Sequence, residues 1–278
     1  MKLKYLGKKS NSQFLDYSPE LLDKVARDRK VKLAFTPLSS IGFYGVDYWN
    51  AYEFSYLDEH NQPIIETLEI KIPANSDFTI ESKSLKIYLA SFFKRKFKNP
   101  ANIYKIIQKD LSKLIQSKVF VRKKIRYDSP PKSILLNRSS NLIAKNKVVK
   151  FEGFRSICPV TSQPDWANIY IHSASHAINP KKVIKILKSF RERGDFHEQC
   201  VESILVQLVQ YLKYEGHHSI LGRLMKKDDD QYLKYLSEIR EVDLTVYGRF
   251  LRRGGIDINP IRSTKKKLYF KNFRDFNQ

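Results

Sequence analysis

A repeated order of predicted secondary structure is the feature that most constrains the fold of this chain. Residues 41–73 combine aromatic and β-favouring residues with an alternating stretch after a turn, which predicts a β-hairpin. Apolar residues at helical spacing predict helices over 82–97 and 100–116, and the stretch at 117–127 predicts a strand. The first half therefore has the predicted order β-β-α-α-β.

The second half repeats this order. Strands are predicted over 148–157 and 166–175, helices over 180–193 and 197–214, and a last strand over 241–253. Comparing the sequence with itself at an offset of 98, which places residue 81 on residue 179, supports a duplication. The identical residues are Lys83 with Lys181, Leu89 with Leu187, and Ser91-Phe92 with Ser189-Phe190.

The repetition predicts two related modules, and the length of 278 residues leaves each of them room for a core. A stretch rich in proline, serine and asparagine between the halves is the natural boundary. The predicted organisation is an N-terminal extension (1–40), a first module (41–130), a linker (131–148), a second module (149–265) and a basic C-terminal tail (266–278).

The formal net charge of +22 is large, and such a charge is typical of proteins that bind nucleic acid or another polyanion. However, the lysines and arginines are spread along the whole sequence rather than gathered in one segment. We therefore favour a generally basic, solvated surface over a focused polyanion site, and we keep RNA binding as an alternative.

The sequence also predicts where the protein resides. The basic start is followed by no apolar region of the kind a signal peptide has, and no window approaches the roughly 18 apolar residues that a membrane span needs. The two cysteines, Cys158 and Cys200, are too few for a disulfide framework, which favours a reducing compartment. We expect a cytoplasmic protein that does not bind membranes.

Cys158 is the residue whose chemistry the local sequence leaves most open. It follows a predicted strand and precedes Pro159, so it belongs to a loop, where reactive groups are often found. Asp165 is close in sequence and could protonate an atom that attack by a thiolate makes basic. Burial as an inert, small hydrophobic residue is the commonest fate of a free cysteine, so both interpretations remain.

The stretch "DFHEQC" places His197 and Glu198 at the start of an amphipathic helix, where polar groups are accessible to a ligand. Glu198 would equally favour the helix dipole there. Zinc binding by Cys158, His197 and Cys200 is an alternative, but no Cys-x-x-Cys pair occurs and Cys200 precedes an apolar stretch typical of a core. We expect no metal, and we expect "GHH" at 216–218 to mark a helix end.

Two stretches have the composition of an anion-binding site. Ser82 is expected to cap the first helix, with Lys83 in its first turn and Lys86 nearby, and helix N-termini bind phosphate groups. Arg252 and Arg253 precede a Gly-Gly turn, where backbone N–H groups are accessible to an anion. Capped basic helices and solvated strand ends are common, so neither stretch identifies a ligand by itself.

Four stretches in this order, "ESKSLKIYL", "CPVTSQPDW", "GDFHE" and "RRGGIDINPIRS", resemble the signature of the NADPH-dependent 7-cyano-7-deazaguanine reductases, the nitrile reductases of the queuosine pathway. The stretch "GVDYWNAYEFSYLDEHNQP" resembles the long, bimodular branch of that family. The resemblance implies an α+β chain of two tandem tunnelling-fold modules, each an antiparallel sheet with its helices on one face, and a homodimer of such chains. Glu81 and Glu198 lie in different halves, which implies a site between the modules.

The resemblance also implies roles for individual residues. Cys158 would add to the nitrile carbon to form a thioimide, Asp165 would protonate the nitrogen, and two hydrides from NADPH would give the aminomethyl product. No metal is implied, and the chain has no G-x-G-x-x-G fingerprint. The residues implied to bind the substrate are Ile80, Glu81, Ser82, Phe196, His197 and Glu198. Those implied to bind NADPH are Ser82, Lys83, Arg253, Gly254 and, as a further candidate, Arg252.

Two other functions are kept as alternatives. A basic RNA-binding protein of the same fold would show an RNA affinity that falls steeply with salt. An amidohydrolase that uses Cys158 as its nucleophile would act without NADPH. A reductase needs only a few basic residues for its dinucleotide, so it leaves the charge of +22 unexplained. We expect no direct nucleic-acid partner.

Overall fold

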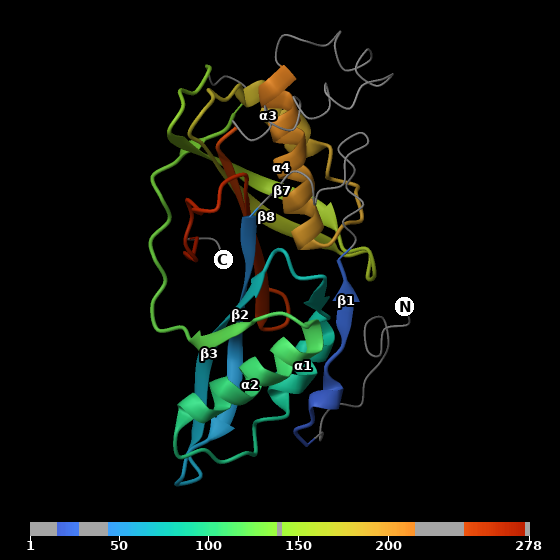
Figure 1. Ribbon diagram of the computed structural model, residues 1–278, viewed down its shortest axis with the longest axis vertical. Helices are drawn as coiled ribbons and strands as arrows, with labels where there is room; N and C mark the ends of the chain where they lie inside the picture. The colour runs from blue at the N-terminus through green and yellow to red at the C-terminus, as the bar shows by residue number, and fades with distance from the viewer. Residues whose placement is uncertain (1–15, 28–43, 138–140, 215–241, 276–278) are drawn as a thin grey trace.

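A computed structural model describes residues 16–27, 44–137, 141–214 and 242–275. An eight-stranded sheet crosses the whole molecule (Figure 1), and every neighbouring pair of its strands is antiparallel except the last. Its strands, in spatial order, are β5 (Phe120–Lys123), β3 (Pro63–Pro73), β2 (Tyr44–Leu57), β10 (Ile256–Ser263), β9 (Leu244–Phe250), β8 (Pro164–Ser173), β7 (Lys147–Ile157) and β6 (Ile134–Leu135).

Four α-helices follow the hairpins of the sheet, as the apolar spacing predicts. Helices α1 (Ser82–Ala90) and α2 (Pro100–Ile115) come after β3, and helices α3 (Pro180–Lys188) and α4 (His197–Tyr214) come after β8. Asn99 and Asn179 cap α2 and α3, and a proline begins each of these two helices. None of the helices in the described ranges is long and apolar enough to cross a membrane.

The β2–β3 and β7–β8 hairpins carry the same irregularity. The pairing of β2 with β3 shifts register between Ala51 and Phe54, and the pairing of β7 with β8 shifts between Phe151 and Phe154. The last residue of β2 and the last residue of β7 each pair with the segment that follows the next helix. Leu57 forms a β-bridge with Lys96, and Ile157 forms one with Gly194. The mixed α+β class is confirmed, and the two halves share details that the sequence comparison did not use.

Strand β10 was not predicted as a strand, and it joins the two halves. It pairs with β2 from Ile256 opposite Ala51 to Ser263 opposite Tyr44, and it pairs with β9 on its other side. Proline and polar residues are depleted in central strands, so Pro260 and its polar neighbours concealed it. The halves are therefore parts of one continuous sheet.

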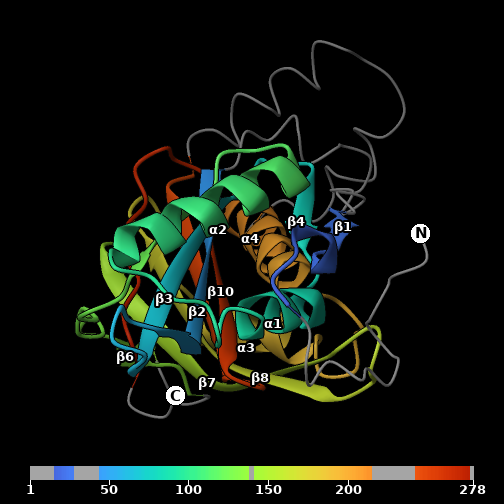
Figure 2. The same ribbon diagram turned by 90° about the horizontal axis from the view of Figure 1, so that it is seen from below.

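The two halves have separate apolar cores on the helical face of the sheet. The first core packs α1 and α2 on strands β2 and β3, and the second packs α3 and α4 on β7, β8 and β9. Figure 2 shows the helices gathered along the sheet. Side chains alternate along each strand, so Val246 faces the second core whereas Tyr247 faces the opposite side.

The chain beyond β10 packs on this opposite face. Phe270 and Phe273 are buried against Tyr170 and Tyr247, and the buried carboxylate of Asp275 accepts hydrogen bonds from neighbouring side chains. The donors are Tyr170 at 2.6 Å, Asn168 at 2.6 Å and Lys150 at 3.2 Å. The basic C-terminal tail is thus part of the folded structure as far as residue 275.

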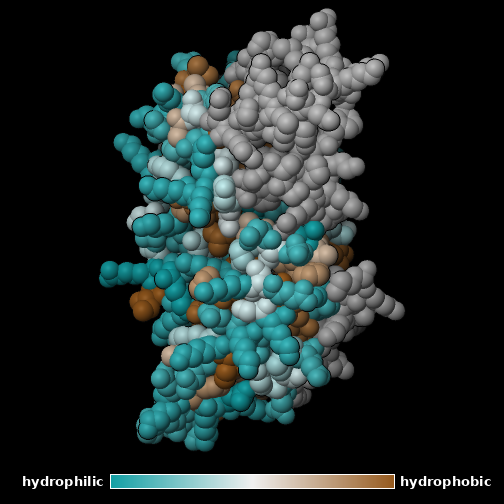
Figure 3. Space-filling view, in the orientation of Figure 1, coloured by the Kyte–Doolittle hydropathy of each residue, from teal (hydrophilic) through white to brown (hydrophobic). Residues whose placement is uncertain are grey.

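Residues before β2 also belong to the first half. A 3-10 helix, η2 (Pro19–Leu21), places Leu21 and Leu22 in the first core. Strand β1 (Lys24–Ala26) forms a separate antiparallel ladder with β4 (Phe78–Ile80), the short strand that leads into α1. The "GHH" stretch at 216–218 lies outside the described residues. The molecular face in Figure 3 is largely hydrophilic and its hydrophobic residues are scattered, as expected for a solvated surface.

Candidate active site

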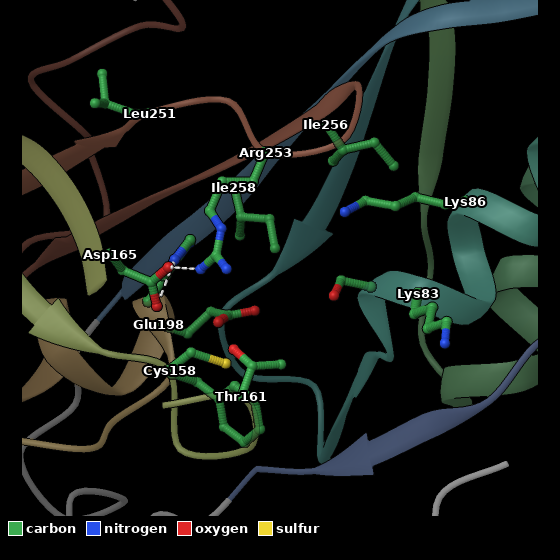
Figure 4. Close-up of a pocket in the computed structure, with 13 residues that line it drawn as sticks. Lys83, Lys86, Cys158, Thr161, Asp165, Glu198, Leu251, Arg253, Ile256 and Ile258 are labelled. Atoms are coloured by element: carbon green, nitrogen blue, oxygen red, sulfur yellow. Dashed lines mark hydrogen bonds and ion pairs between the residues drawn. The ribbon is translucent and has the colours of Figure 1, made fainter. Parts of the chain in front are cut away.

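A cavity of about 250 Å3 opens where the two halves meet. Helix α1 of the first half and strand β10 form part of its wall, and the remainder comes from the loop after β7, the first turn of α4 and the turn before β10. In Figure 4 the side chains of Cys158, Asp165 and Glu198 lie on one side of the cavity, and Lys83 and Lys86 lie on the other. The cavity therefore combines a thiol and two carboxyl groups with a basic wall.

Cys158 lies at the first position after β7, in a tight loop. Its N–H donates to the carbonyl of Gln163 at 2.8 Å, and the N–H of Ser162 donates to its carbonyl at 3.0 Å. The free thiol is partly exposed and lines the cavity. Cys200 differs, because it is wholly buried in the second core and burial raises the pKa of its thiol to about 12. Of the two thiols, only that of Cys158 is accessible to a ligand in the cavity.

Asp165 is the second residue of strand β8, beside this loop, and is only 4% exposed. Its carboxylate forms an ion pair with the guanidinium of Arg253, and His197 Nε2 lies 3.4 Å from its other oxygen. Burial acts to raise the pKa of Asp165, but the bonds and charges of His197 and Arg253 outweigh it and hold this pKa below its ordinary value. Asp165 is therefore ionised at neutral pH in the ligand-free site.

His197 occupies the first position of α4 and stacks on Phe250, with ring centres 3.9 Å apart and an angle of 5° between the planes. One ring nitrogen faces Asp165. The other, Nδ1, is buried and has no hydrogen-bond partner among the residues that the structure describes. Buried polar atoms are normally satisfied, so this nitrogen is available to a bound ligand or water.

Glu198, the next residue, is buried at the bottom of the cavity. The hydroxyl of Thr79 donates to its Oε1 at 3.1 Å. Burial raises the pKa of Glu198, and the nearby negative charge of Asp47 raises it further. The carboxyl group gains a proton more readily than an exposed glutamate, and a ligand that donates hydrogen bonds to it would favour its ionised form.

Glu81 has a different position from the one expected. It is the N-cap of α1, a place that the sequence predicted for Ser82, and its carboxylate accepts from the N–H groups of Lys83 and Ser84 at 2.7 Å each. Glu81 is 1% exposed, and Ile80 is buried in the first core. Four of the predicted substrate-binding residues line the cavity, whereas Ile80 and Glu81 do not. The four are Ser82, Phe196, His197 and Glu198.

The basic wall consists of Lys83, Lys86 and Arg253. Lys86, which follows Lys83 by one helical turn, is predicted from the sequence to lie near the anion-binding helix N-terminus, although the resemblance did not give it a role in binding NADPH. Burial lowers the pKa of Lys86, and the neighbouring charge of Arg253 lowers it further. Arg252, by contrast, does not line the cavity, because its guanidinium lies over the ring of Tyr52 at 5.3 Å.

The turn beside this wall requires glycine. Gly254 has a φ of +55°, which favours glycine, and a Cβ there would lie 3.0 Å from Lys86 Nζ. Gly254 and Gly255 do not themselves line the cavity, but they bring backbone close to the three cations. Cations beside accessible backbone suit the phosphate groups of a dinucleotide, so these residues fit NADPH.

A zinc site would require a different arrangement of its three candidate ligands, Cys158, His197 and Cys200. Cys200 is enclosed in the second core. Within the ranges that the structure covers, no group of three or more His, Cys, Asp or Glu side chains is arranged to hold a metal ion. The cavity also contains four residues that sequence analysis did not assign to it. They are Thr161, Leu251, Ile256 and Ile258, and their types carried no signal of a site.

Comparison with known proteins agrees with this geometry. Residues 14–123 match a family described as "Nitrile reductase, 7-cyano-7-deazaguanine-reductase N-term", and residues 164–219 match one described as "QueF-like protein". Relatives named "NADPH-dependent 7-cyano-7-deazaguanine reductase" occur in Coxiella burnetii strains Dugway 5J108-111 and CbuK_Q154. Each is 33% identical over 284 residues, which cover 95% of this chain and 92% of the relative. The chain belongs to the family of 7-cyano-7-deazaguanine nitrile reductases.

Proposed function

We propose that this protein uses NADPH to reduce the nitrile of 7-cyano-7-deazaguanine to the aminomethyl group of 7-aminomethyl-7-deazaguanine, a step of queuosine biosynthesis for tRNA. The observation that carries the proposal is one cavity that combines the accessible thiol of Cys158 with Asp165, Glu198 and a basic wall. The names of the relatives support the same substrate and reductant.

Recognition of the base is assigned to Glu198, assisted by Glu81. A guanine-like edge offers a ring N–H beside an exocyclic amino group, and a carboxylate accepts hydrogen bonds from both. Phe196 would pack on the flat heterocycle and His197 would contact the substrate. Glu81 would act together with the main chain of Ile80 and Ser82, since its carboxylate oxygens each have a further lone pair beyond the helix amides.

The covalent step is assigned to Cys158 and Asp165. Sulfur attacks the nitrile carbon, a C–S bond forms, and one pair of π electrons moves to the nitrogen. Asp165 is an ionised carboxylate in the free site, so it first accepts the thiol proton and then returns it to this nitrogen, which gives a neutral thioimide. Arg253 and His197 hold the carboxylate in place for both transfers.

Binding of the dinucleotide is assigned to the basic wall. Ser82, Lys83 and Arg253 would contact its phosphates with the backbone of Gly254, and Lys86 joins them from the next turn of α1. Arg252 would take part only by leaving its place over Tyr52. Bound NADPH would supply a hydride to the thioimide carbon, the C–S bond would then break so that sulfur returns to Cys158, and hydride from a second NADPH would reduce the C=N bond that remains to the amine.

The finer architecture is part of the proposal. We assign residues 41–130 and 149–265 to two tunnelling-fold modules joined by residues 131–148, flanked by 1–40 and 266–278, in a cytoplasmic homodimer. Matching register shifts in the two hairpins support an origin by duplication. RNA binding finds no support beyond the overall charge of +22.

The test is an assay with purified protein, 7-cyano-7-deazaguanine and NADPH. Wild-type protein should consume two equivalents of NADPH for each aminomethyl product, and substrate alone should add its mass to the protein. Cys158→Ala should lose both the turnover and the added mass. Turnover retained in this variant would overturn the role of Cys158, and conversion without NADPH would favour the amidohydrolase instead.

A further inference from the structure

We propose that Thr79, on strand β4 of the first half, is a positioning residue that orients the carboxyl group of Glu198 on helix α4 of the second half. This inference rests on the proposed role of Glu198 in binding the base. The two residues are 119 positions apart in sequence, and the hydroxyl of Thr79 donates to Glu198 Oε1 at 3.1 Å in a buried contact. Thr79 does not itself line the cavity, so it would act through Glu198 alone.

The ladder of β1 and β4 directs the Thr79 side chain toward the second half. Residues alternate between the two faces of a strand, and the neighbours Phe78 and Ile80 both pack on the first core. Thr79 therefore faces the other way. Val25 pairs with Thr79 across the ladder. The N–H of Arg27 donates to the carbonyl of Asp77 at 2.9 Å and the N–H of Glu81 donates to the carbonyl of Asp23 at 2.9 Å, so both ends of this short strand are held.

A buried set of charges fixes helix α4, and its members Asp47 and Arg27 also act electrostatically on the Glu198 carboxyl. Glu202, one turn after Glu198, forms an ion pair with Arg262 of β10 at 2.7 Å. Arg262 also pairs with Asp47 at 2.6 Å, and Asp47 pairs with Arg27 at 2.5 Å. These pairs hold the helix against the sheet, yet none of them contacts the Glu198 carboxyl. Thr79 supplies the one side-chain hydrogen bond described for Glu198.

The orientation matters because the ligand is planar. To accept two hydrogen bonds from adjacent donors on a base edge, the carboxyl group must lie nearly in the plane of that base. A hydroxyl donor bound to Oε1 restricts rotation of the carboxyl and still leaves lone pairs for the ligand. Loss of this donor would allow other rotamers, so ligand affinity would fall while the reacting groups at Cys158 and Asp165 keep their places.

The test compares three variants. Thr79→Val removes the hydroxyl but keeps the shape and suits a strand, Thr79→Ser restores the hydroxyl, and Thr245→Val removes a buried hydroxyl that bonds to Ser263 away from the cavity. We expect Thr79→Val to raise KM for 7-cyano-7-deazaguanine about tenfold with kcat nearly unchanged. Thr79→Ser and Thr245→Val should stay within about threefold of wild type.

A second measurement separates this inference from the proposed function. Titration of 7-cyano-7-deazaguanine into Cys158→Ala protein reports non-covalent binding, and adding Thr79→Val should weaken it about tenfold. If wild-type protein neither turns over nor binds this base, the proposed function fails. If it does both, and Thr79→Val leaves both KM and binding unchanged, only the role of Thr79 is overturned. A loss shared equally by Thr245→Val would also overturn it.

Discussion

The turns of the β2–β3 and β7–β8 hairpins have a similar backbone frame and different chemistry. After β2, the N–H of Asp58 donates to the carbonyl of Gln62 at 3.0 Å, and after β7 the N–H of Cys158 donates to the carbonyl of Gln163 at 2.8 Å. In the first turn the Asp58 side chain accepts from the N–H groups of His60 and Gln62 at 2.8 Å each, so it stabilises its own loop. In the second the thiol is left for the cavity.

The helices that follow extend the comparison. Glu81 caps α1 and Asn179 caps α3, and each side chain accepts from two N–H groups of its own helix. Both helices span nine residues and have a serine, Ser91 or Ser189, as the C-cap. Corresponding turns and helices in the two halves thus keep similar backbone hydrogen bonds while individual side chains differ in role. A side chain can change from a structural to a chemical role because these backbone hydrogen bonds do not depend on it.

The sharpest test of this comparison is to replace the first residue of each turn, Cys158 or Asp58, with serine. Cys158→Ser should reduce turnover more than about a thousandfold, because a hydroxyl is a far weaker nucleophile than a thiolate. Asp58→Ser should leave turnover within about twofold and lower stability by about 1 kcal/mol, because only turn contacts are lost. NADPH oxidation and denaturant unfolding measure the two effects. Equal losses of turnover would show that the turns are not functionally distinct.

The next largest effect is expected at Asp165. Asp165→Asn keeps the size of the side chain but removes the charge that accepts and returns the thiol proton, so kcat should fall about a hundredfold or more. It also leaves Arg253 without its anionic partner, so KM for NADPH is to be measured alongside. A kcat within about threefold of wild type would exclude Asp165 from proton transfer.

A pH dependence of substrate binding is expected from Glu198. Its pKa is raised by burial and by Asp47, and the facing charges of Arg27 and His197 oppose this rise. Base donors require the ionised carboxylate, so KM for the nitrile should fall as pH rises from about pH 5 toward about pH 8, and level off above the pKa of Glu198. Glu198→Gln should raise KM and abolish this dependence. A flat profile in wild type would contradict the assignment.

The smallest effect is expected from substitutions at the N-caps of α1 and α3. Asn179→Ala and Glu81→Ala should each lower the free energy of unfolding by about 1 kcal/mol, because each removes the acceptor for two helix N–H groups. Only Glu81→Ala should also raise KM for the nitrile. Thermal unfolding and steady-state kinetics on the same samples separate these outcomes. An equal KM for both variants would leave Glu81 as a cap alone.

The local sequence pattern predicted most of the helices and strands, but not how the two halves are joined in one sheet. The hairpin and the four helices follow from periodicity, and the structure confirms that they exist, but α1 ends at Ala90 rather than at residue 97 and α3 at Lys188 rather than at residue 193, while residues 41–43 of the hairpin lie outside the described ranges. Strand β10 was missed because its pairing partner lies some two hundred residues away and its composition is atypical. The packing of residues 268–275 on the sheet was missed for the same reason, since a long-range surface decides it.

The site was predictable as a set of residues rather than as a geometry. Motifs carried by the resemblance included Cys158 and Glu198, which line the cavity. The motifs could not show that Arg253 and His197 keep Asp165 ionised. That effect requires the turn before β10 and the start of α4 to lie beside Asp165 in the folded chain. Nor could the motifs separate Arg253, in the cavity wall, from its neighbour Arg252, which lies over Tyr52.

The place of β10 in the sheet has a consequence for synthesis of the protein on the ribosome. Ile256 pairs with Ala51, so β10 must insert beside a strand that was synthesised about two hundred residues earlier. Such non-local pairing slows folding and exposes unpaired strand edges while the chain grows. Because Ile256 and Ile258 line the cavity, the nascent chain has no complete active site until this strand has emerged.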